Sequence, residues 1–252
     1  FIHRMADHVV FFDEALEIRR EVFGPDHTEV GATINNRGIV EYYEGDYTAA
    51  EASFDETLRI FRANYPEDHP NVLSGIGNLG AVLRQQGKLD EAEVLIRATL
   101  ETRVRVLGPD HHNTGGSWNN LAGILRDAGR YAEAEEPVSN AVRIFQEALG
   151  PEHPDLADAR LNKGKILVGL GRAGEWVEEM RLACAVSESR YEPEHPNLAD
   201  CRSILGLALL DAGDEEAARQ ELARSVEILE ESRGDNPFTQ RARAALDGLS
   251  GS

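Results

Sequence analysis

Five histidines recur at a constant spacing of 42 residues in a chain of 252 residues. Imidazole is a common metal ligand and titrates near physiological pH, so the series raises the hypotheses of a metal site and of a pH sensor. Helix layers lie about 8–10 Å apart, and a repeat of this length supplies two layers, so consecutive histidines are too distant to share an ion. We therefore interpret them as turn residues before a helix and predict no metal site. They are His27, His69, His111, His153 and His195.

A second series consists of asparagines with the same spacing. A side-chain amide both donates and accepts hydrogen bonds, so a row of amides can hold the backbone of an extended peptide without reading its sequence. The alternative is that each amide satisfies a neighbouring helix end or turn. The row comprises Asn36, Asn78, Asn120 and Asn162, and Asn35 and Asn119 stand beside it.

Aromatic and charged side chains accompany the asparagines at helical spacing. Across the second, third and fourth periods they leave a surplus of one positive charge, in a chain whose net charge is −19. We hypothesise that these side chains attract an acidic or carboxylate-bearing peptide. A solvated polar face with incidental charges is the alternative. The tyrosines are Tyr42 and Tyr43, the cations are Arg84, Arg126 and Lys165, and the carboxylates are Asp127 and Asp158.

The composition excludes several classes of protein. With 41% hydrophobic and 28% charged residues the chain can bury a core, which argues against disorder. The 45 acidic against 26 basic side chains argue against binding to nucleic acid or anionic lipid. No segment approaches the roughly 18 uninterrupted apolar residues of a membrane helix. Because the chain begins at Phe1, we expect it to be a fragment.

Two cysteines, Cys184 and Cys201, cannot form a disulfide scaffold or a four-ligand zinc site. The helices that carry them are expected to pack together, so the two side chains can lie close to each other. We predict buried free thiols and a reducing, cytoplasmic location.

Glycines repeat with the same period and divide it into two elements. Between them the apolar residues follow helical spacing, as at Trp118, Leu121 and Leu125. Each period is therefore predicted to contain a helix A of about 15 residues, a tight turn and a helix B of about 18. Asn71, Asp155 and Asn197 are predicted to be the N-caps of their helices A. The turn glycines are Gly45, Gly87, Gly129, Gly171 and Gly213.

Small residues occupy one position in each helix, which predicts close packing within every hairpin. One hairpin cannot bury its apolar face, whereas stacked hairpins can, so the period predicts an α-solenoid. Trp176 is the exception to the pattern in helix B. The small residues are Gly38, Gly80, Ala122, Gly164 and Gly206 in helix A, and Ala50, Ala92, Ala134 and Ala218 in helix B.

Two G-x-G-x-x-G patterns, at residues 75–80 and 169–174, imitate a dinucleotide-binding loop. The first falls inside a predicted helix A, and the second contains the turn glycine Gly171. No P-loop, nucleophile elbow, H-E-x-x-H or C-x-x-C pattern occurs. We therefore predict no catalytic residue, no enzymatic activity and no cofactor.

The pattern W-N-N-L-A-x-x-L-x-x-x-G-R-Y-x-E-A-E, from Trp118 to Glu135, resembles tetratricopeptide repeats. The 42-residue period with its D-H-P turn is similar to the kinesin light chain type, and a bacterial source is expected. The resemblance implies an all-α, right-handed superhelix of antiparallel hairpins, with helix A on the concave surface. It also implies that the asparagine row contacts peptide backbone there.

Some residues depart from the pattern of these repeats. The first repeat has Arg37 and Glu41 where the others mostly have leucine, and Arg160 and Arg202 occupy the position of Trp118. These departures indicate less standard packing or an unidentified polar contact. Pro137, early in a helix B, predicts a mild bend.

The phase of the period divides the chain, a single predicted domain of residues 1–252, into five full repeats and two halves. We predict a half repeat at 5–23, full repeats at 28–65, 70–107, 112–149, 154–191 and 196–233, and a capping helix at 236–249. The predicted function is a scaffold that binds a peptide or protein in its concave groove. The alternative is a regulatory segment of a signalling protein such as a kinase or nucleotide-binding ATPase. Self-association is also open, because uncapped solenoid ends expose apolar faces.

Overall fold

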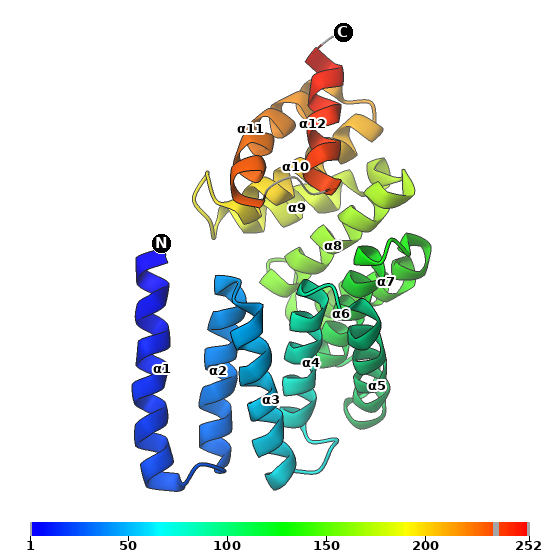
Figure 1. The fold of residues 1–252 in the computed structure, drawn as a ribbon. Coiled ribbons are helices and arrows are strands. Elements are labelled where there is room, and N and C mark those ends of the chain that lie inside the picture. The colour runs from blue at the N-terminus through cyan, green and yellow to red at the C-terminus, as the bar shows by residue number, and fades with distance from the viewer. Residues whose placement is uncertain (1, 234–236, 251–252) are drawn as a thin grey trace. The chain divides into compact units, whose positions relative to one another are not determined.

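A computed structural model describes residues 2–233 and 237–250 (Figure 1). Within those ranges the chain forms twelve α-helices and one short 3-10 helix, and no strand. The predicted all-α class is confirmed. The helices are α1 (Ile2–Phe23), α2 (Thr28–Glu44), α3 (Tyr47–Asn64), α4 (Pro70–Gln85), α5 (Leu89–Leu107), α6 (His112–Asp127), α7 (Tyr131–Leu149), α8 (Pro154–Leu170), η1 (Ala173–Trp176), α9 (Val177–Glu188), α10 (Pro196–Asp211), α11 (Glu215–Arg233) and α12 (Pro237–Ser250).

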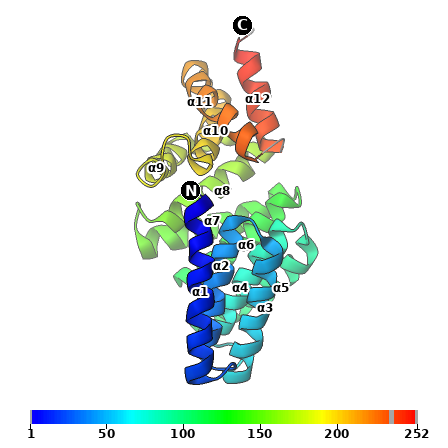
Figure 2. The ribbon, with the colours of Figure 1, turned by 60° about the vertical axis from the view of Figure 1, so that its left-hand side comes forward.

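The helices form two compact units, residues 1–109 with α1 to α5 and residues 110–252 with α6 to α12. In unit 1, α1 packs on α2, and the hairpins α2–α3 and α4–α5 stack on each other (Figures 1 and 2). In unit 2, the hairpins α6–α7, α8–α9 and α10–α11 stack in order, and α12 packs on α10 and α11. The first helices of neighbouring hairpins also contact each other: α2 contacts α4, and α8 contacts α10. Residue 236, the predicted start of the last helix, lies outside the described residues.

Each helix A begins at a histidine. The Nδ1 atom of His27, His69, His111, His153 or His195 accepts a hydrogen bond of 3.1–3.2 Å from the backbone N–H two residues later. The prediction that Asn71, Asp155 and Asn197 are N-caps is therefore wrong. Proline occupies the first helical position in these three repeats, as its fixed φ angle favours, which moves the N-cap back to the histidine.

The turn glycines end each helix A as predicted. Their φ angles lie between 71° and 85°, in the left-handed region that residues with a Cβ atom rarely adopt. Both glycine-rich patterns that imitate a dinucleotide loop belong to this architecture. Residues 75–80 lie inside α4, and Gly171 is the C-cap of α8.

The predicted small residues allow the two helices of a hairpin to touch. A Cβ atom placed on Gly80 would lie 2.6 Å from Cδ1 of Ile96, and one on Gly206 would lie 2.7 Å from Cγ of Leu222. Both distances are shorter than the roughly 3.5–4.0 Å of carbon atoms in contact. The alanines at the small position of helix B are fully buried at Ala50, Ala92, Ala134 and Ala218.

The fourth repeat differs from this pattern. Its second helix, α9, has only 12 residues and is preceded by η1, so the long helix B predicted here is wrong. Trp176 occupies the small position, and its indole Nε1 donates to the carbonyl of Arg160 at 3.3 Å. The N–H of Gly174 in turn donates to Oδ2 of Asp211 at 2.7 Å. The 3-10 helix η1, which carries the large indole, thus takes the place of the first turns of an ordinary helix B.

The two cysteines form a disulfide. Cys184 on α9 and Cys201 on α10 have their Cα atoms 5.6 Å apart and are joined by an S–S bond. The prediction of free thiols is therefore wrong, although their proximity was expected from consecutive helices. The bond closes a loop with a sequence separation of 17, and a loop of this length is stabilised by about 3 kcal/mol through its effect on the unfolded chain.

Polar contacts explain the departures from the repeat pattern. In the first repeat, Arg37 pairs with Glu41 at 3.2 Å and with Asp13 at 3.1 Å. In the fourth, the buried Arg160 pairs with Glu179 at 2.7 Å and donates to the carbonyl of Pro151 in the preceding turn at 3.1 Å. In the fifth, Arg202 donates to the equivalent carbonyl of Pro193 at 3.5 Å and pairs with Glu188 at 3.1 Å and with Glu221 at 4.0 Å. Helix α7 continues through Pro137.

The outward side of α1 carries exposed apolar residues. Phe11, Ile18 and Val22 are 65%, 62% and 66% exposed, whereas Leu16 on the other side is buried against α2. Exposed apolar residues at the first helix are compatible with self-association, which stays a prediction.

The histidine caps lead to a first prediction. Replacing His153 with alanine removes the acceptor for the N–H of Asp155, so we expect the free energy of unfolding to fall by about 1 kcal/mol. His153→Asn retains an acceptor at the same position and should keep most of that stability. Urea unfolding followed by circular dichroism measures both variants. Equal losses in the two variants would show that the cap does not depend on a hydrogen-bond acceptor.

Candidate functional site

The candidate site in each unit is the surface formed by one stripe of positions on its helices A, which we call the helix-A face of that unit. In unit 1 it lies on α2 and α4, and in unit 2 on α6, α8 and α10. Its residues are Asn35, Asn36, Tyr42, Tyr43, Asn78 and Arg84 in unit 1, and Asn119, Asn120, Arg126, Asp158, Asn162, Lys165, Val168, Leu207, Leu210 and Asp211 in unit 2.

Two asparagines of the row join neighbouring helices A. In unit 1, Nδ2 of Asn78 donates to Oδ1 of Asn35 at 3.0 Å. In unit 2, Nδ2 of Asn162 donates to Oδ1 of Asn119, also at 3.0 Å. These two amides are therefore bonded within the protein, to an asparagine side chain of the neighbouring helix A rather than to a helix end or turn. Each pair links consecutive hairpins within its unit.

The other two asparagines of the row keep their amides available. Asn36 is exposed and Asn120 is half-buried. Within the described ranges, 2–233 and 237–250, neither side chain has a hydrogen-bond partner. Each follows directly after the acceptor of an Asn–Asn pair, Asn35 or Asn119, so the pair fixes the helix that presents it.

An aromatic cluster lies at the C-terminal end of α2. The ring of Tyr42 contacts Tyr43 edge to face and Tyr47 at a tilt, with centroids 5.5 and 5.6 Å apart. The Tyr42 hydroxyl accepts a hydrogen bond of 3.0 Å from Nε2 of Gln85 on α4. Tyr43 is 73% exposed, so the cluster presents a ring to solvent. Gln85 was not among the predicted site residues.

The cations of unit 2 are paired within the protein. Arg126 contacts Oδ1 of Asp127 at 2.6 Å and donates to Oδ1 of Asn162 at 2.7 Å. Lys165 pairs with Asp200 of α10, and both side chains are largely buried. Asp200 was not predicted, although it lies 42 residues after Asp158. It offsets the predicted surplus of positive charge.

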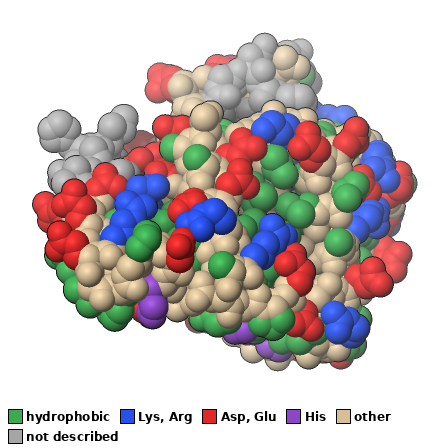
Figure 3. Space-filling model, turned by 60° about the horizontal axis from the view of Figure 1, so that its bottom comes forward, with side chains coloured by type: hydrophobic (Ala, Val, Ile, Leu, Met, Phe, Trp, Pro, Cys, Tyr) green, Lys and Arg blue, Asp and Glu red, His purple; other side chains and the backbone are tan. Residues whose placement is uncertain are grey.

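The rest of the surface shows the same mixture of charges. Figure 3 shows acidic and basic side chains interspersed over the face drawn, with acidic ones the more widespread. In unit 1, Arg84 is half-buried on α4.

Asp158 is the carboxylate of the helix-A face with a perturbed ionisation. Loss of hydration raises the pKa of Asp158, and this effect exceeds the attraction of Arg190 and Lys165 for the charged form. The side chain nevertheless remains accessible to solvent.

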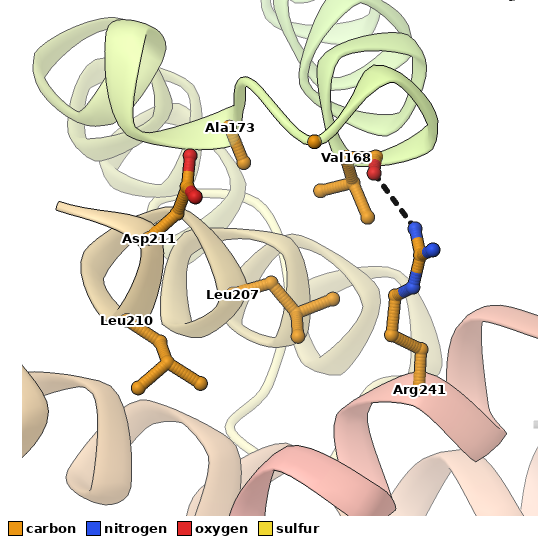
Figure 4. A pocket seen from close by; sticks show the side chains of 7 residues that line it. Val168, Ala173, Leu207, Leu210, Asp211 and Arg241 are labelled. Carbon is orange, nitrogen blue, oxygen red and sulfur yellow. Dashed lines mark hydrogen bonds between the residues drawn. The ribbon is translucent and has the colours of Figure 1, made fainter.

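The helix-A face of unit 2 ends in a small cavity of about 250 Å³ (Figure 4). Apolar side chains from α8, η1 and α10 form its wall, and Asp211 and Arg241 lie on opposite sides of it. Arg241, on α12, donates from Nη1 to the carbonyl of Val168 at 2.7 Å. The apolar residues are Val168, Ala173, Leu207 and Leu210.

A profile of the tetratricopeptide repeat family matches residues 9–63, 68–137 and 115–175. The chain belongs to the tetratricopeptide repeat family. Proteins built from these repeats are generally non-catalytic scaffolds for protein–protein interaction, so a protein partner is expected in general terms. None of the curated proteins matches the chain.

Solved structures agree on the fold. BtubC (BKLC) from P. vanneervenii is 20% identical with a TM-score of 0.68, over 92% of this chain and 94% of that one. A Podosopora anserina protein described as a kinesin light chain with nearly identical TPR-like repeats is 20% identical with a TM-score of 0.62, over 83% and 99%. A chain of the APC/C hetero-tetramer Cut9–Hcn1 is 14% identical with a TM-score of 0.68, over 98% of this chain and 40% of that one. The repeats are thus of the kinesin light chain-like type in fold.

The described tetratricopeptide repeats offer neither a membrane span nor a metal site. Among the residues that the structure describes, no helix is long and apolar enough to cross the hydrocarbon core of a bilayer. The same residues contain no group of three or more histidine, cysteine, aspartate or glutamate side chains arranged to hold a metal ion.

The two kinds of asparagine in the tetratricopeptide repeats should respond differently to substitution. Asn162 is 7% exposed and bonds both Asn119 and Arg126, so Asn162→Ala should lower the free energy of unfolding by about 1–3 kcal/mol. Asn120→Ala removes no internal bond and should change it by less than about 0.5 kcal/mol. Denaturant unfolding of both variants checks the difference, and similar losses would contradict the division of the row into two kinds.

Asp158 provides a prediction about pH. Its folded-state pKa is raised, so its ionisation costs stability at neutral pH, and Asp158→Asn should stabilise the protein there. The gain should vanish below about pH 4, where aspartate is protonated in the unfolded chain as well. Asp155→Asn is the control, and it should lower the stability at neutral pH. Asp155 lies in the first turn of α8, where the helix dipole favours a carboxylate. Thermal unfolding between pH 3 and 7 measures the effect, and an Asp158→Asn variant less stable than the parent at pH 7 would contradict it.

Proposed function

We propose that the helix-A face binds an extended segment of a partner protein through its backbone. The observation that carries the proposal is that the amides of Asn36 and Asn120 have no hydrogen-bond partner among the residues that the structure describes. Each amide can donate to a carbonyl and accept from an N–H of a segment bound at its own unit. This role suits a chain whose repeats belong to an interaction-scaffold family, and the exposed ring of Tyr43 adds an apolar contact in unit 1.

The paired asparagines serve this function indirectly. Asn35–Asn78 and Asn119–Asn162 fix the positions of neighbouring helices A in each unit. A site whose donors are already positioned loses less conformational entropy on binding. Asn78 and Asn162 are therefore proposed to position the site rather than to contact the partner.

An acidic partner was predicted from the cations of the face. Arg126 and Lys165 form ion pairs with Asp127 and Asp200, so they attract a further carboxylate only weakly. We propose that recognition by Asn36 and Asn120 depends on backbone rather than on charge. The alternative of a regulatory segment in a signalling protein stays a prediction, because none of the observations bears on a catalytic domain.

The compartment was predicted to be cytoplasmic because a chain with only two cysteines favours a reducing environment. Cys184 and Cys201 form a disulfide, which is typical of oxidising compartments, so these residues give the prediction no support. The cytoplasmic location stays a prediction.

The proposal is tested with the double variant Asn36→Ala/Asn120→Ala of the whole chain. Partners are captured from lysate on immobilised protein, identified by mass spectrometry, and titrated as purified proteins. Each amide makes two hydrogen bonds of about 1 kcal/mol each with the segment bound at its unit, so their loss should weaken binding at either unit about 30-fold. Asn140→Ala is the matched control, because Asn140 is a half-buried asparagine on α7, a helix B.

Partners that bind the parent and the Asn140→Ala variant but not the double variant would support the helix-A face. Undiminished affinity of the double variant for every purified partner would overturn the proposal.

A further inference from the structure

Helix α1 corresponds to a helix B, and one of its long sides is uncovered. Within the described part of unit 1 it packs on α2 alone and stands at the end of the stack of that unit (Figure 1). Phe11, Ile18 and Val22 lie at helical spacing beside this contact, and each is at least 62% exposed. Phe12 and Ala15 next to them are half-buried. We call these five residues the α1 face.

The 42-residue period shows what covers the same positions in a complete hairpin. Phe12 lies one period before Phe54 of α3, which is 1% exposed. Ile18 lies one period before Ile60 of α3, which is fully buried. Phe54 packs on the helix A of its own hairpin, where a Cβ atom on Gly38 would lie 2.9 Å from Cε1 of the ring. The α1 face is therefore the surface on which a helix B receives its helix A.

A helix A is thin on the side that touches its helix B. Four of the five helices A from α2 to α10 carry two small residues seven positions apart, which places both on one side of the helix. A helix that docks on α1 needs the same feature, because larger side chains would hold it away from Phe12 and Ile18. The small pairs are Gly31 and Gly38 in α2, Gly115 and Ala122 in α6, Ala157 and Gly164 in α8, and Ala199 and Gly206 in α10.

A second copy of the described chain does not supply such a helix. The helices A from α2 to α10 are already packed on their own helices B or on η1. Helix α12 also corresponds to a helix A, but it is shifted by one residue. Gln240 and Asp247 therefore stand where α10 has Ala199 and Gly206, and both side chains are exposed. The helix that fits α1 belongs to another protein.

An acidic stripe borders the α1 face. Glu14, Glu17 and Glu21 are exposed, and none of them has an ion-pair partner among the described side chains. On α3 the residue equivalent to Glu14 is Glu56, which pairs with Arg59 at 2.8 Å. Helix α1 has Glu17 in place of this arginine. Three such carboxylates beside an apolar surface favour lysine or arginine along the facing edge of a docked helix.

We propose that the α1 face binds an amphipathic helix of a partner protein, with two small residues seven positions apart and basic residues along one edge. This helix takes the place of a helix A and completes a hairpin with α1. The surface is separate from the helix-A face, so the inference goes beyond the proposed function and does not depend on Asn36 or Asn120.

The experiment uses the whole chain and a fluorescent probe that imitates a helix A. The probe has the sequence 111–129 of α6, is held helical by a hydrocarbon link on its outer side, and carries Ser117→Lys and Leu121→Lys. The edge with position 117 faces the preceding helix B in the chain, as the contact of Gly75 with Leu58 shows at the equivalent position of α4. On α1 this edge lies beside the acidic stripe. Fluorescence anisotropy should show saturable binding.

Two further probes separate charge from shape. A probe with Ser117→Gln and Leu121→Gln should bind about fivefold more weakly at low salt, because it lacks two exposed ion pairs, and the difference should disappear at high salt. A probe that keeps the lysines but carries Gly115→Leu and Ala122→Leu should bind at least tenfold more weakly, because its larger side chains prevent close contact.

Variants of the protein locate the binding surface. Ile18→Asp should weaken binding of the lysine probe about 30-fold, because the buried isoleucine side chain is replaced by a charge. Val94→Asp is the matched control and should leave the affinity unchanged, since Val94 is a 73% exposed valine on α5, another helix B. The triple variant Glu14→Gln/Glu17→Gln/Glu21→Gln should bind the lysine and glutamine probes equally.

Absence of saturable binding by the lysine probe would overturn the inference. Undiminished binding to Ile18→Asp, or equal affinity for the probe with leucine at the small positions, would also overturn it. Sedimentation velocity examines a second copy as the alternative occupant. Dimers of the parent chain that Ile18→Asp dissociates and the lysine probe does not displace would assign the α1 face to self-association instead.

Discussion

The close contact between a small residue of helix A and a large residue of helix B sets the geometry of every hairpin. Helix B can lie against the backbone of helix A only where no side chain intervenes, as Gly38 allows for Phe54 and Gly80 for Ile96. The buried apolar surface of each hairpin depends on this approach, and so does the stacking that covers it. The spacing between neighbouring helices A, and hence the position of the asparagines, follows from the same contact.

The fourth repeat shows how far this constraint extends. Trp176 is too large for the small position of helix B, and the beginning of that helix is replaced by η1. The contact of Gly164 with Met180 is nevertheless kept, since a Cβ atom on Gly164 would lie 2.6 Å from its sulfur. The register of the repeat is therefore preserved from α9 onwards. The displaced segment brings Ala173 and Gly174 beside Asp211, and so forms one wall of the cavity.

Most of the fold could be predicted because the period is a property of local chemistry. Turn glycines need positive φ angles, and small residues mark helix contacts, so both can be recognised one repeat at a time. The N-caps were predicted wrongly because histidine is an unusual N-cap. Asn71 and Asp155, which follow the proline, are of residue types that commonly cap helices. The disulfide was missed because the sequence placed the two cysteines close together without fixing their side-chain directions.

The site was harder to predict because its bonds join residues of different repeats. The asparagines of the row share one spacing of 42 residues. Whether such an amide bonds within the protein depends on a second residue, which lies in the previous repeat and one position earlier. Asn78 bonds Asn35 and Asn162 bonds Asn119, each 43 residues earlier, whereas the corresponding residue before Asn120 is Gly77, which has no side chain to bond. Asp200 could have been found from the 42-residue spacing that it shares with Asp158. Arg241 could not, because the last helix is shifted by one residue relative to the others.

The helix-A face of unit 2 changes character along its length, and this change gives a bound segment a direction. At α6 and α8 the face offers amides and paired charges, which suit backbone contact. At α10 the asparagine position is taken by Ile204, and the position of Arg126 on α6 is taken by Val168 at the end of α8 and by Leu210 on α10. An extended chain therefore gains hydrogen bonds at one end and apolar burial at the other. A peptide bound in reverse would place its apolar residues among the amides and paired charges of α6, where they gain no apolar burial, so the gradient favours one orientation over the other.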